Sequence, residues 1–195
     1  MACQFEEDRI VSTWIPHALP VRYSASAKLM HWLVAAAVIV LLALGPVMKR
    51  LVPEGSLRDS LYSFHEALGA LVLIVMVVRL ARREAFGVPA PDSALPPVEQ
   101  RASLWAQYLL YVLIFVTTVL GWAATNAYGD PVSVFGLFDF PNILGKDQPL
   151  SDRIIVWHLI FGILIGLIAA LHIAGALYHW LVKRDRVFQR MLPGN

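Results

Sequence analysis

Apolar residues in this chain are concentrated in four long segments, which polar and charged stretches separate. The segments cover residues 29–48, 61–80, 104–124 and 154–182. Each matches the ~20 residues that an α-helix needs to cross the hydrocarbon core of a bilayer, and the last is long enough to tilt or to enter the headgroups. The pattern predicts an all-α integral membrane four-helix bundle, one domain over residues 1–195 with an N-terminal tail at 1–23.

Local signals indicate the helix ends and the connectors. Ser24 or Ser26 is positioned to cap the first helix, and Pro46 is expected to end it. Segment 81–103 contains four prolines and is expected to form an irregular connector. Segment 126–153 forms the longer connector. Its aromatic side chains are expected to lie on the bilayer surface; they are Phe135, Phe138 and Phe140.

The composition supports a lipid environment. Hydrophobic residues make up 58% of the chain, charged residues only 15%, and the mean hydropathy is +0.62. A soluble domain has about 25% charged residues, so too few polar side chains remain to cover a surface in water. The net charge of +2 is nearly balanced and indicates no nucleic-acid partner. The charged residues among positions 1–28 are not typical of a signal peptide, so the first apolar segment is expected to stay as a membrane anchor.

The chain has a single cysteine, Cys3. One cysteine excludes an intramolecular disulfide and a cysteine-ligated iron–sulfur cluster. It also excludes covalent haem attachment, which needs a C-x-x-C-H run. Any haem is therefore expected to be held non-covalently.

Lysine and arginine positions predict the orientation. With the N-terminus inside, the inner segments and helix ends hold 11 of these residues, against five outside. Positive residues accumulate on the cytoplasmic side, so we expect both termini in the cytoplasm, although Lys49 and Arg50 oppose this. The family resemblance given below implies the bacterial inner membrane. Tryptophans near the span ends mark the two interfaces. They are Trp32, Trp105, Trp122, Trp157 and Trp180.

Histidine is the residue type that points to chemistry. Five of the six histidines lie in the spans, namely His31, His65, His158, His172 and His179. A single intramembrane histidine most often forms a hydrogen bond between helices, and for each one taken alone this interpretation stays open. Five of them with few other ionisable groups indicate a functional site, because each is costly in hydrocarbon. His17 lies in the tail and is interpreted as a surface residue.

Helix geometry arranges four of these histidines in two pairs. His158 and His172 are 14 residues apart, so they share a helix face to within ~40° and stand ~21 Å apart along the axis. His65 lies at the outer end of the second span, and His31 lies near the inner end of the first. Two level pairs result, His65–His158 outside and His31–His172 inside. Bis-imidazole ligation of two stacked b-type haems requires such an arrangement.

Small residues follow the histidine face of the fourth span. Gly162, Ala169 and Ala176 project on that side, and Gly69 lies one turn beyond His65. They leave room for a flat macrocycle. The alternative interpretation is that Gly162 and Gly166 form a G-x-x-x-G helix-packing motif.

Two further residues are candidates for contacts with a quinone or a haem propionate. Pairing His179 with His31 would separate two irons by ~31 Å and move both haems into the headgroups. His179 therefore stays near the inner surface, either as an interfacial histidine beside Trp180 or as a group that binds or protonates a quinone. Arg79 follows His65 by 14 residues and reaches the depth of the inner pair. Its guanidinium suits a propionate or a quinone oxygen; the alternative is a snorkelling cation.

Other metal chemistry does not match the residue types. A di-iron carboxylate bundle needs several buried carboxylates, and Glu66 alone lies near the membrane. A zinc site would need its ligands clustered at one level.

Sequence motifs around the histidines are similar to one protein family. They are K-L-M-H-W-L (28–33), F-H-E-A-L-G (64–69), M-V-V-R-L (76–80), F-G-L (135–137), W-H (157–158), L-H-I-A-G-A-L-Y-H-W (171–180) and R-M-L-P (190–193). Over most of residues 22–193, the chain resembles the bacterial cytochrome b561 family, which is related to the cytochrome b subunits of nickel–iron hydrogenases.

This resemblance implies a four-helix dihaem protein. The iron ligands that it implies are His31, His65, His158 and His172, with Arg79 and His179 as candidates at the quinone end. One type within the family is a superoxide oxidase, in which superoxide reduces the outer haem and the inner haem reduces ubiquinone. Near relatives take electrons instead from a partner subunit or a small periplasmic protein.

The leading hypothesis is electron transfer from periplasmic superoxide, through two haem b groups, to ubiquinone in the bilayer. Lys146 and Arg153 favour an anionic donor, while aspartates of the same segment oppose it; these are Asp130, Asp139, Asp147 and Asp152. Two alternatives stay open. One is a haem b anchor and relay subunit of a larger membrane dehydrogenase, or the partner of a periplasmic redox protein. The other is a proton-coupled transporter that uses the histidines without haem.

Overall fold

The computed structural model describes residues 22–90 and 95–192, and most of these are helical. The four long helices are α2 (Ala25–Arg50), α3 (Ser56–Phe86), α4 (Pro97–Tyr128) and α5 (Gln148–Tyr178). A π-helical turn, η1 (His179–Lys183), and a 3-10 turn, η2 (Phe188–Met191), follow. All four long helices have the length and apolar composition to cross a membrane, which confirms the predicted four-helix membrane bundle. Outside the described residues lie Cys3, Trp14, His17 and most of the 1–23 tail.

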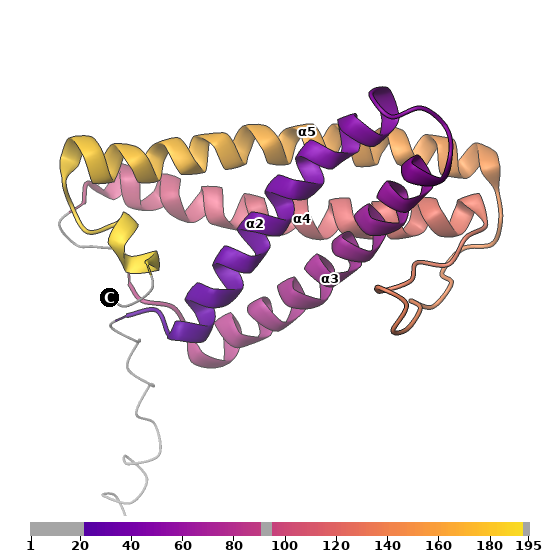
Figure 1. The fold of residues 1–195 in the computed structure, drawn as a ribbon. Helices are drawn as coiled ribbons and strands as arrows, with labels where there is room; N and C mark the ends of the chain where they lie inside the picture. The colour runs from indigo at the N-terminus through magenta and orange to yellow at the C-terminus, as the bar shows by residue number, and fades with distance from the viewer. Residues whose placement is uncertain (1–21, 91–94, 193–195) are drawn as a thin grey trace, which may run out of the picture.

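The helices form two antiparallel hairpins, α2 with α3 and α4 with α5 (Figure 1). The first hairpin crosses the second obliquely, and α3 packs on α4 where they meet. In contrast, α2 and α5 make few contacts with each other. Helix α2 carries His31 and α5 carries His172, the two histidines that the sequence predicts to form the inner pair. The sparse packing leaves space for side chains between these two helices.

The start of α2 follows the prediction, but its end does not. The Ala27 amide donates a hydrogen bond to Ser24 Oγ (3.2 Å), so Ser24 is the N-cap. The prediction that Pro46 ends the helix is wrong, since α2 continues to Arg50. Proline removes one backbone hydrogen bond, and a membrane helix tolerates this where neighbouring groups and local adjustments compensate.

The predicted irregular connector 81–103 is also mostly wrong. Helix α3 continues to Phe86 and ends at Gly87, whose φ of 67° is readily adopted by glycine. Helix α4 then begins at Pro97. Proline is favoured in the first turn of a helix, because its missing N–H has no helical partner there. Only the short stretch between Gly87 and Pro97 is connector.

The core between the two ends of the bundle is apolar. Its buried residues come from all four helices, namely Val34, Val72, Met76, Leu113, Ile114 and Ile165. Ile165 lies seven residues from both His158 and His172, so this layer separates the two histidine levels. Outward-facing residues such as Leu167 (58% exposed) and Leu171 (69% exposed) are apolar as well, as expected where lipid is the solvent.

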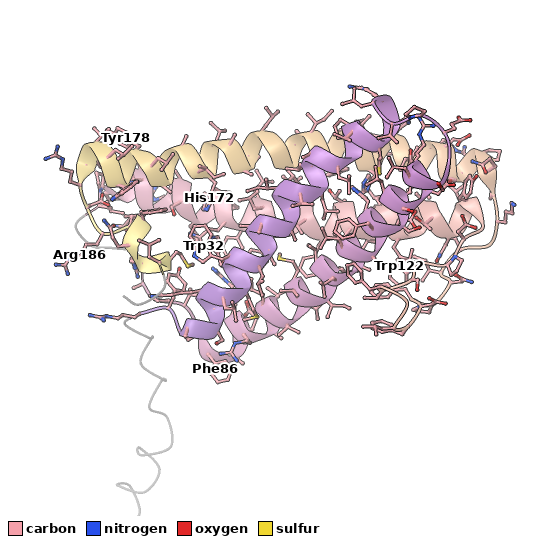
Figure 2. The ribbon with its side chains drawn as sticks, in the orientation of Figure 1. Trp32, Phe86, Trp122, His172, Tyr178 and Arg186 are labelled. Carbon is pink, nitrogen blue, oxygen red and sulfur yellow. The ribbon has the colours of Figure 1, made fainter. Side chains whose placement is uncertain are left out.

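The connector between α4 and α5 folds back onto the bundle. Val132 and Val134 are buried against Ala70 of α3. Phe140 packs on Trp122, with ring centroids 5.1 Å apart, so this aromatic faces the protein. The other two aromatics of the connector are about half exposed and remain candidates for the bilayer surface. Figure 2 shows Trp122 at this end of the bundle, and Trp32 and Tyr178 toward the other.

Candidate functional site

Two pairs of histidine rings face each other inside the bundle. His65 of α3 and His158 of α5 form the outer pair, with ring centroids 6.1 Å apart. His31 of α2 and His172 of α5 form the inner pair, with centroids 6.4 Å apart. All four side chains are partly buried. The juxtapositions deduced from the 14-residue step are therefore present in the structure.

The spacing within each pair fits a metal ion between the rings. An imidazole nitrogen binds a transition metal at about 2.0 Å, so two rings on one ion have centroids about 6.3 Å apart. Within residues 22–90 and 95–192, no three His, Cys, Asp or Glu side chains converge as a metal site. Each pair therefore offers two protein ligands, and the remaining coordination positions suit a macrocycle.

The glycines beside the pairs also leave space. A Cβ added at Gly69 or Gly162 would meet no atom of the described residues within 4 Å. The same holds at Gly166. A helix-packing G-x-x-x-G motif would bring a neighbouring backbone close at both positions. The structure does not support that alternative for Gly162 and Gly166.

His158 is oriented from helix α4. Its Nδ1 lies 2.9 Å from the Thr117 carbonyl oxygen. A carbonyl only accepts, so Nδ1 carries the hydrogen and Nε2 keeps a free lone pair for a metal. Gly121 makes room for the ring, because an added Cβ would lie 3.1 Å from His158 Cε1. Sequence reasoning missed both α4 residues; a glycine inside an apolar span was the one signal for Gly121.

His31 has a different neighbour. Arg79 Nη2 lies 3.1 Å from His31 Nδ1, which confirms that Arg79 reaches the depth of the inner pair. A guanidinium has no acceptor, so Nδ1 must accept and the hydrogen must sit on Nε2. The Arg79 guanidinium also lies over the Tyr111 ring, 5.2 Å from its centroid. Metal binding through Nε2 would require the Arg79–His31 hydrogen bond to break.

Arg79 lines a pocket of about 190 Å³ at the end of the bundle where α3 ends and α2 and α4 begin, hereafter the basic end. Three other arginines line it, Arg22, Arg82 and Arg83. Tyr23, Gln107 and Tyr111 contribute polar atoms, and Met30, Phe86 and Met191 contribute apolar surface. This combination of positive charge, hydrogen-bonding groups and apolar wall suits an amphipathic or anionic group.

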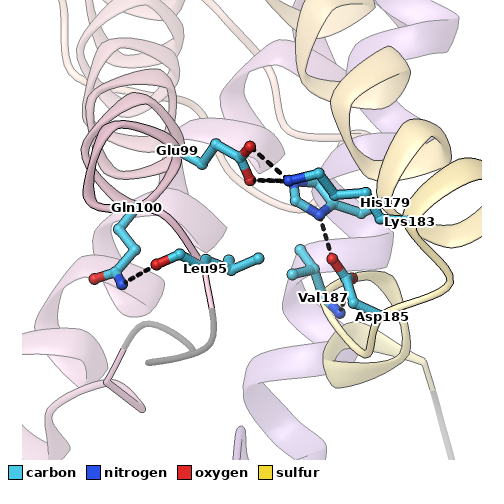
Figure 3. Close-up of polar contacts among 7 residues, drawn as sticks. All are labelled: Leu95, Glu99, Gln100, His179, Lys183, Asp185 and Val187. Carbon is cyan, nitrogen blue, oxygen red and sulfur yellow. Dashed lines mark hydrogen bonds and ion pairs between the residues drawn. The ribbon is translucent and has the colours of Figure 1, made fainter.

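His179 lies outside the lining of that pocket and has its own partners (Figure 3). Its Nδ1 donates to Asp185 Oδ2 at 2.6 Å, and its Nε2 lies 3.9 Å from Glu99 Oε2. Lys183 Nζ also pairs with Glu99, at 2.6 Å from Oε2. Burial opposes the charge on Asp185, but hydrogen bonds from His179 and the Val187 amide outweigh burial and lower the pKa of Asp185. The cluster ties the end of α5 to the start of α4.

Comparisons with known proteins show which family the chain matches. Residues 22–194 match the sequence model of the family described as prokaryotic cytochrome b561. Cytochrome b561 homolog 2 of Escherichia coli (strain K12) is 28% identical over 173 residues, covering 89% of this chain and 92% of the relative. The probable superoxide oxidase CybB of Yersinia pestis is 24% identical over 172 residues, covering 88% and 96%. Cytochrome b562 of Cereibacter sphaeroides is 27% identical over 169 residues, covering 84% and 90%.

Proposed function

The chain belongs to the prokaryotic cytochrome b561 family, a family of haem b membrane electron-transfer proteins, and from this premise we propose that it uses two haem b groups to pass electrons from a periplasmic one-electron donor to ubiquinone. The single observation that carries the proposal is the pair of facing imidazoles at each of two levels, with centroids 6.1 and 6.4 Å apart. A transporter that uses these histidines without haem does not agree with membership of a cytochrome family.

We propose that His65 and His158 hold the outer haem iron, and that His31 and His172 hold the inner one. Haem iron between two imidazoles supplies reversible one-electron chemistry. Thr117 keeps the hydrogen of His158 on Nδ1, and such a bond fixes the orientation of a metal-binding imidazole and raises its basicity. Gly121 keeps the space that this ring orientation needs.

Arg79 has a second role in the proposal. If His31 held iron through Nε2, its Nδ1 would carry the hydrogen and would repel the guanidinium, and Arg79 would need another partner. The 190 Å³ pocket that Arg79 lines is open to that partner. A haem propionate or a quinone oxygen accepts a charge-assisted hydrogen bond from arginine. The proposal assigns Arg79 to this contact, and His179 to a supporting place beside it, where it holds the C-terminal segment through Asp185.

Superoxide is the proposed donor. Two facts support it: the Yersinia pestis relative is a probable superoxide oxidase, and the cations Lys146 and Arg153 lie in the connector predicted at the outer end. The test supplies superoxide continuously to the purified oxidised protein and follows reduction of its haem spectrum, then adds a short-chain ubiquinone. Reduction well above the chemical background, followed by reoxidation on quinone addition, is expected. Reduction no faster than the background would overturn superoxide as the donor.

A relay subunit of a larger membrane dehydrogenase, or the partner of a periplasmic redox protein, is the second candidate. It is favoured by the outer-end carboxylates, which weaken attraction of an anion; these include Asp130, Asp139, Asp147 and Asp152. Purification of the chain in mild detergent separates the candidates. A fixed partner that co-purifies, and without which the haems are not reduced, supports the relay; activity of the chain alone supports the superoxide oxidase.

A further inference from the structure

A second pocket at the basic end is separate from the histidine pairs. It has a volume of about 470 Å³ and is lined by the start of the described chain and by the C-terminal segment. The lining residues are Arg22, Tyr23, Arg184, Asp185, Arg186, Gln189 and Arg190. Four of these seven residues are arginines, so the pocket is strongly positive and is here named the arginine pocket.

The one carboxylate in the arginine pocket is already engaged. Asp185 Oδ2 accepts the hydrogen bond from His179, and Asp185 Oδ1 accepts one from the Val187 amide at 3.0 Å. Arg22, Arg184 and Arg186 have no ion-pair partner among the described residues. Within residues 22–90 and 95–192, no carboxylate pairs with these three guanidiniums, so an anion entering the pocket need not displace a described carboxylate from them.

The position of the pocket indicates which anion meets it. Beyond α5, the chain folds back toward the start of α2 (Figure 1), where Trp32 Nε1 donates to the Met191 carbonyl at 2.8 Å. Phe188 of the same segment stacks on Trp180, with centroids 5.3 Å apart. Apolar side chains of this segment thus pack on the helix ends, while Arg186 projects outward (Figure 2). From this layout we infer that the arginines lie at the level of lipid headgroups.

We propose that the arginine pocket binds the phosphate group of an anionic phospholipid from the adjacent leaflet. A phosphate diester offers acceptor oxygens that match the guanidinium fork. Basic pockets at the cytoplasmic ends of membrane helices recognise anionic headgroups in this way. Neither histidine pair contributes a residue to this pocket, and Arg184 and Arg186 line this pocket but not the one beside Arg79.

The test counts lipid molecules that stay bound. Protein equilibrated with equal parts of phosphatidylglycerol and phosphatidylcholine is examined by native mass spectrometry. The double variant Arg184→Gln with Arg186→Gln should bind phosphatidylglycerol about 30-fold more weakly, and Arg186→Gln alone about fivefold. The single variant keeps the left-handed turn at Arg184 (φ 55°) unchanged, so it covers the case in which the double variant folds poorly. The matched control is Lys49→Gln with Arg101→Gln, which removes the same charge outside the pocket and should bind like the parent chain.

Two measurements accompany the count. The haem spectrum of each variant should equal that of the parent, which separates a lipid effect from a haem effect. Phosphatidylglycerol, and not inorganic phosphate at the same concentration, should raise the thermal unfolding midpoint of the parent. An equal rise with inorganic phosphate would overturn the lipid as ligand, and an equal loss of lipid in the control variant would overturn the pocket as its site.

Discussion

The outer and inner histidine pairs have nearly the same ring spacing, but the protein holds them in different ways. At the outer pair, a backbone carbonyl sets the hydrogen on His158 Nδ1. At the inner pair, the charged side chain of Arg79 occupies His31 Nδ1. His158 is therefore already in the tautomer that could hold a metal through Nε2, whereas His31 would have to exchange its tautomer and release Arg79 to do so.

This difference assigns different tasks to the two ends. A carbonyl in a helix cannot move far, so the orientation of the His158 ring is rigid, whereas His65 Nδ1 is buried with no hydrogen-bond partner among the described residues. A guanidinium on a long side chain can change partners, and Arg79 has an adjoining pocket in which to do so. Under the proposed function, an anionic or carbonyl group that enters that pocket would act on the inner pair through Arg79, which contacts His31. This division agrees with the proposal that electrons enter at the outer pair and leave at the inner pair.

The largest expected effect comes from removing one ring from either pair. His158→Ala or His172→Ala should each lower the haem-to-protein ratio from two to one, and reduce the α-band of the reduced-minus-oxidised spectrum to about half. His179→Ala is the matched control and should keep both haems, because its ring nitrogens face Asp185 and Glu99. An unchanged ratio in both pair variants would falsify the assignment of ligands.

The next effect tests the rigidity of the outer pair. Gly121→Val places a branched side chain where even a Cβ would lie 3.1 Å from His158 Cε1. Displacing a ligand from its orienting partner typically costs 10–100-fold in metal affinity, so we expect a loss of about tenfold or more for the outer haem. Titration of the haem-free protein with haem measures this affinity. Gly166→Ala serves as control, since its Cβ meets no described atom within 4 Å; equal losses in both variants would contradict the role of Gly121.

A smaller effect is expected at the inner pair. Arg79→Gln removes the guanidinium from His31 and from the pocket. Haem content should stay unchanged, because His31 no longer has to release a cation. Reoxidation by ubiquinone should slow about tenfold, because a charge-assisted hydrogen bond is lost. Stopped-flow reoxidation of the prereduced protein separates these outcomes. Arg101→Gln removes an exposed charge outside the pocket and should reoxidise at the parent rate; loss of the inner haem in Arg79→Gln would contradict the proposed exchange.

The smallest effect concerns the cluster that anchors the C-terminal segment. The pKa of Asp185 is lower in the folded protein than its ordinary value, so its stabilising contribution is complete above about pH 4 and is lost as the pH falls through the folded pKa. The loss should be on the order of 1 kcal/mol or less, as for other partly exposed ion pairs. Acid titration followed by tryptophan fluorescence measures it through Trp180, which stacks on Phe188. Asp185→Asn should remove this transition; its persistence would show that another group titrates.

Two helix boundaries were predicted wrongly from local sequence signals. Pro46 and the prolines of 81–103 are strong breakers by sequence, yet α2 passes through Pro46 and α4 starts at Pro97. In a bilayer, the free energy of leaving backbone groups unpaired exceeds the cost of one missing helical bond. The helix therefore continues past a residue that would end it in water.

The sequence by itself determined the four spans and the partners within each histidine pair. The spans follow from the length of the apolar segments. The pairs follow from helix geometry, since 14 residues of α-helix return a side chain to nearly the same face ~21 Å along the axis. Tertiary structure alone decided what touches the other sides of those rings. Thr117 meets His158 across 41 positions, Arg79 meets His31 across 48, and Glu99 meets Lys183 across 84. Such contacts depend on how far each helix is rotated and tilted against its neighbours, and no periodicity within one helix contains that information.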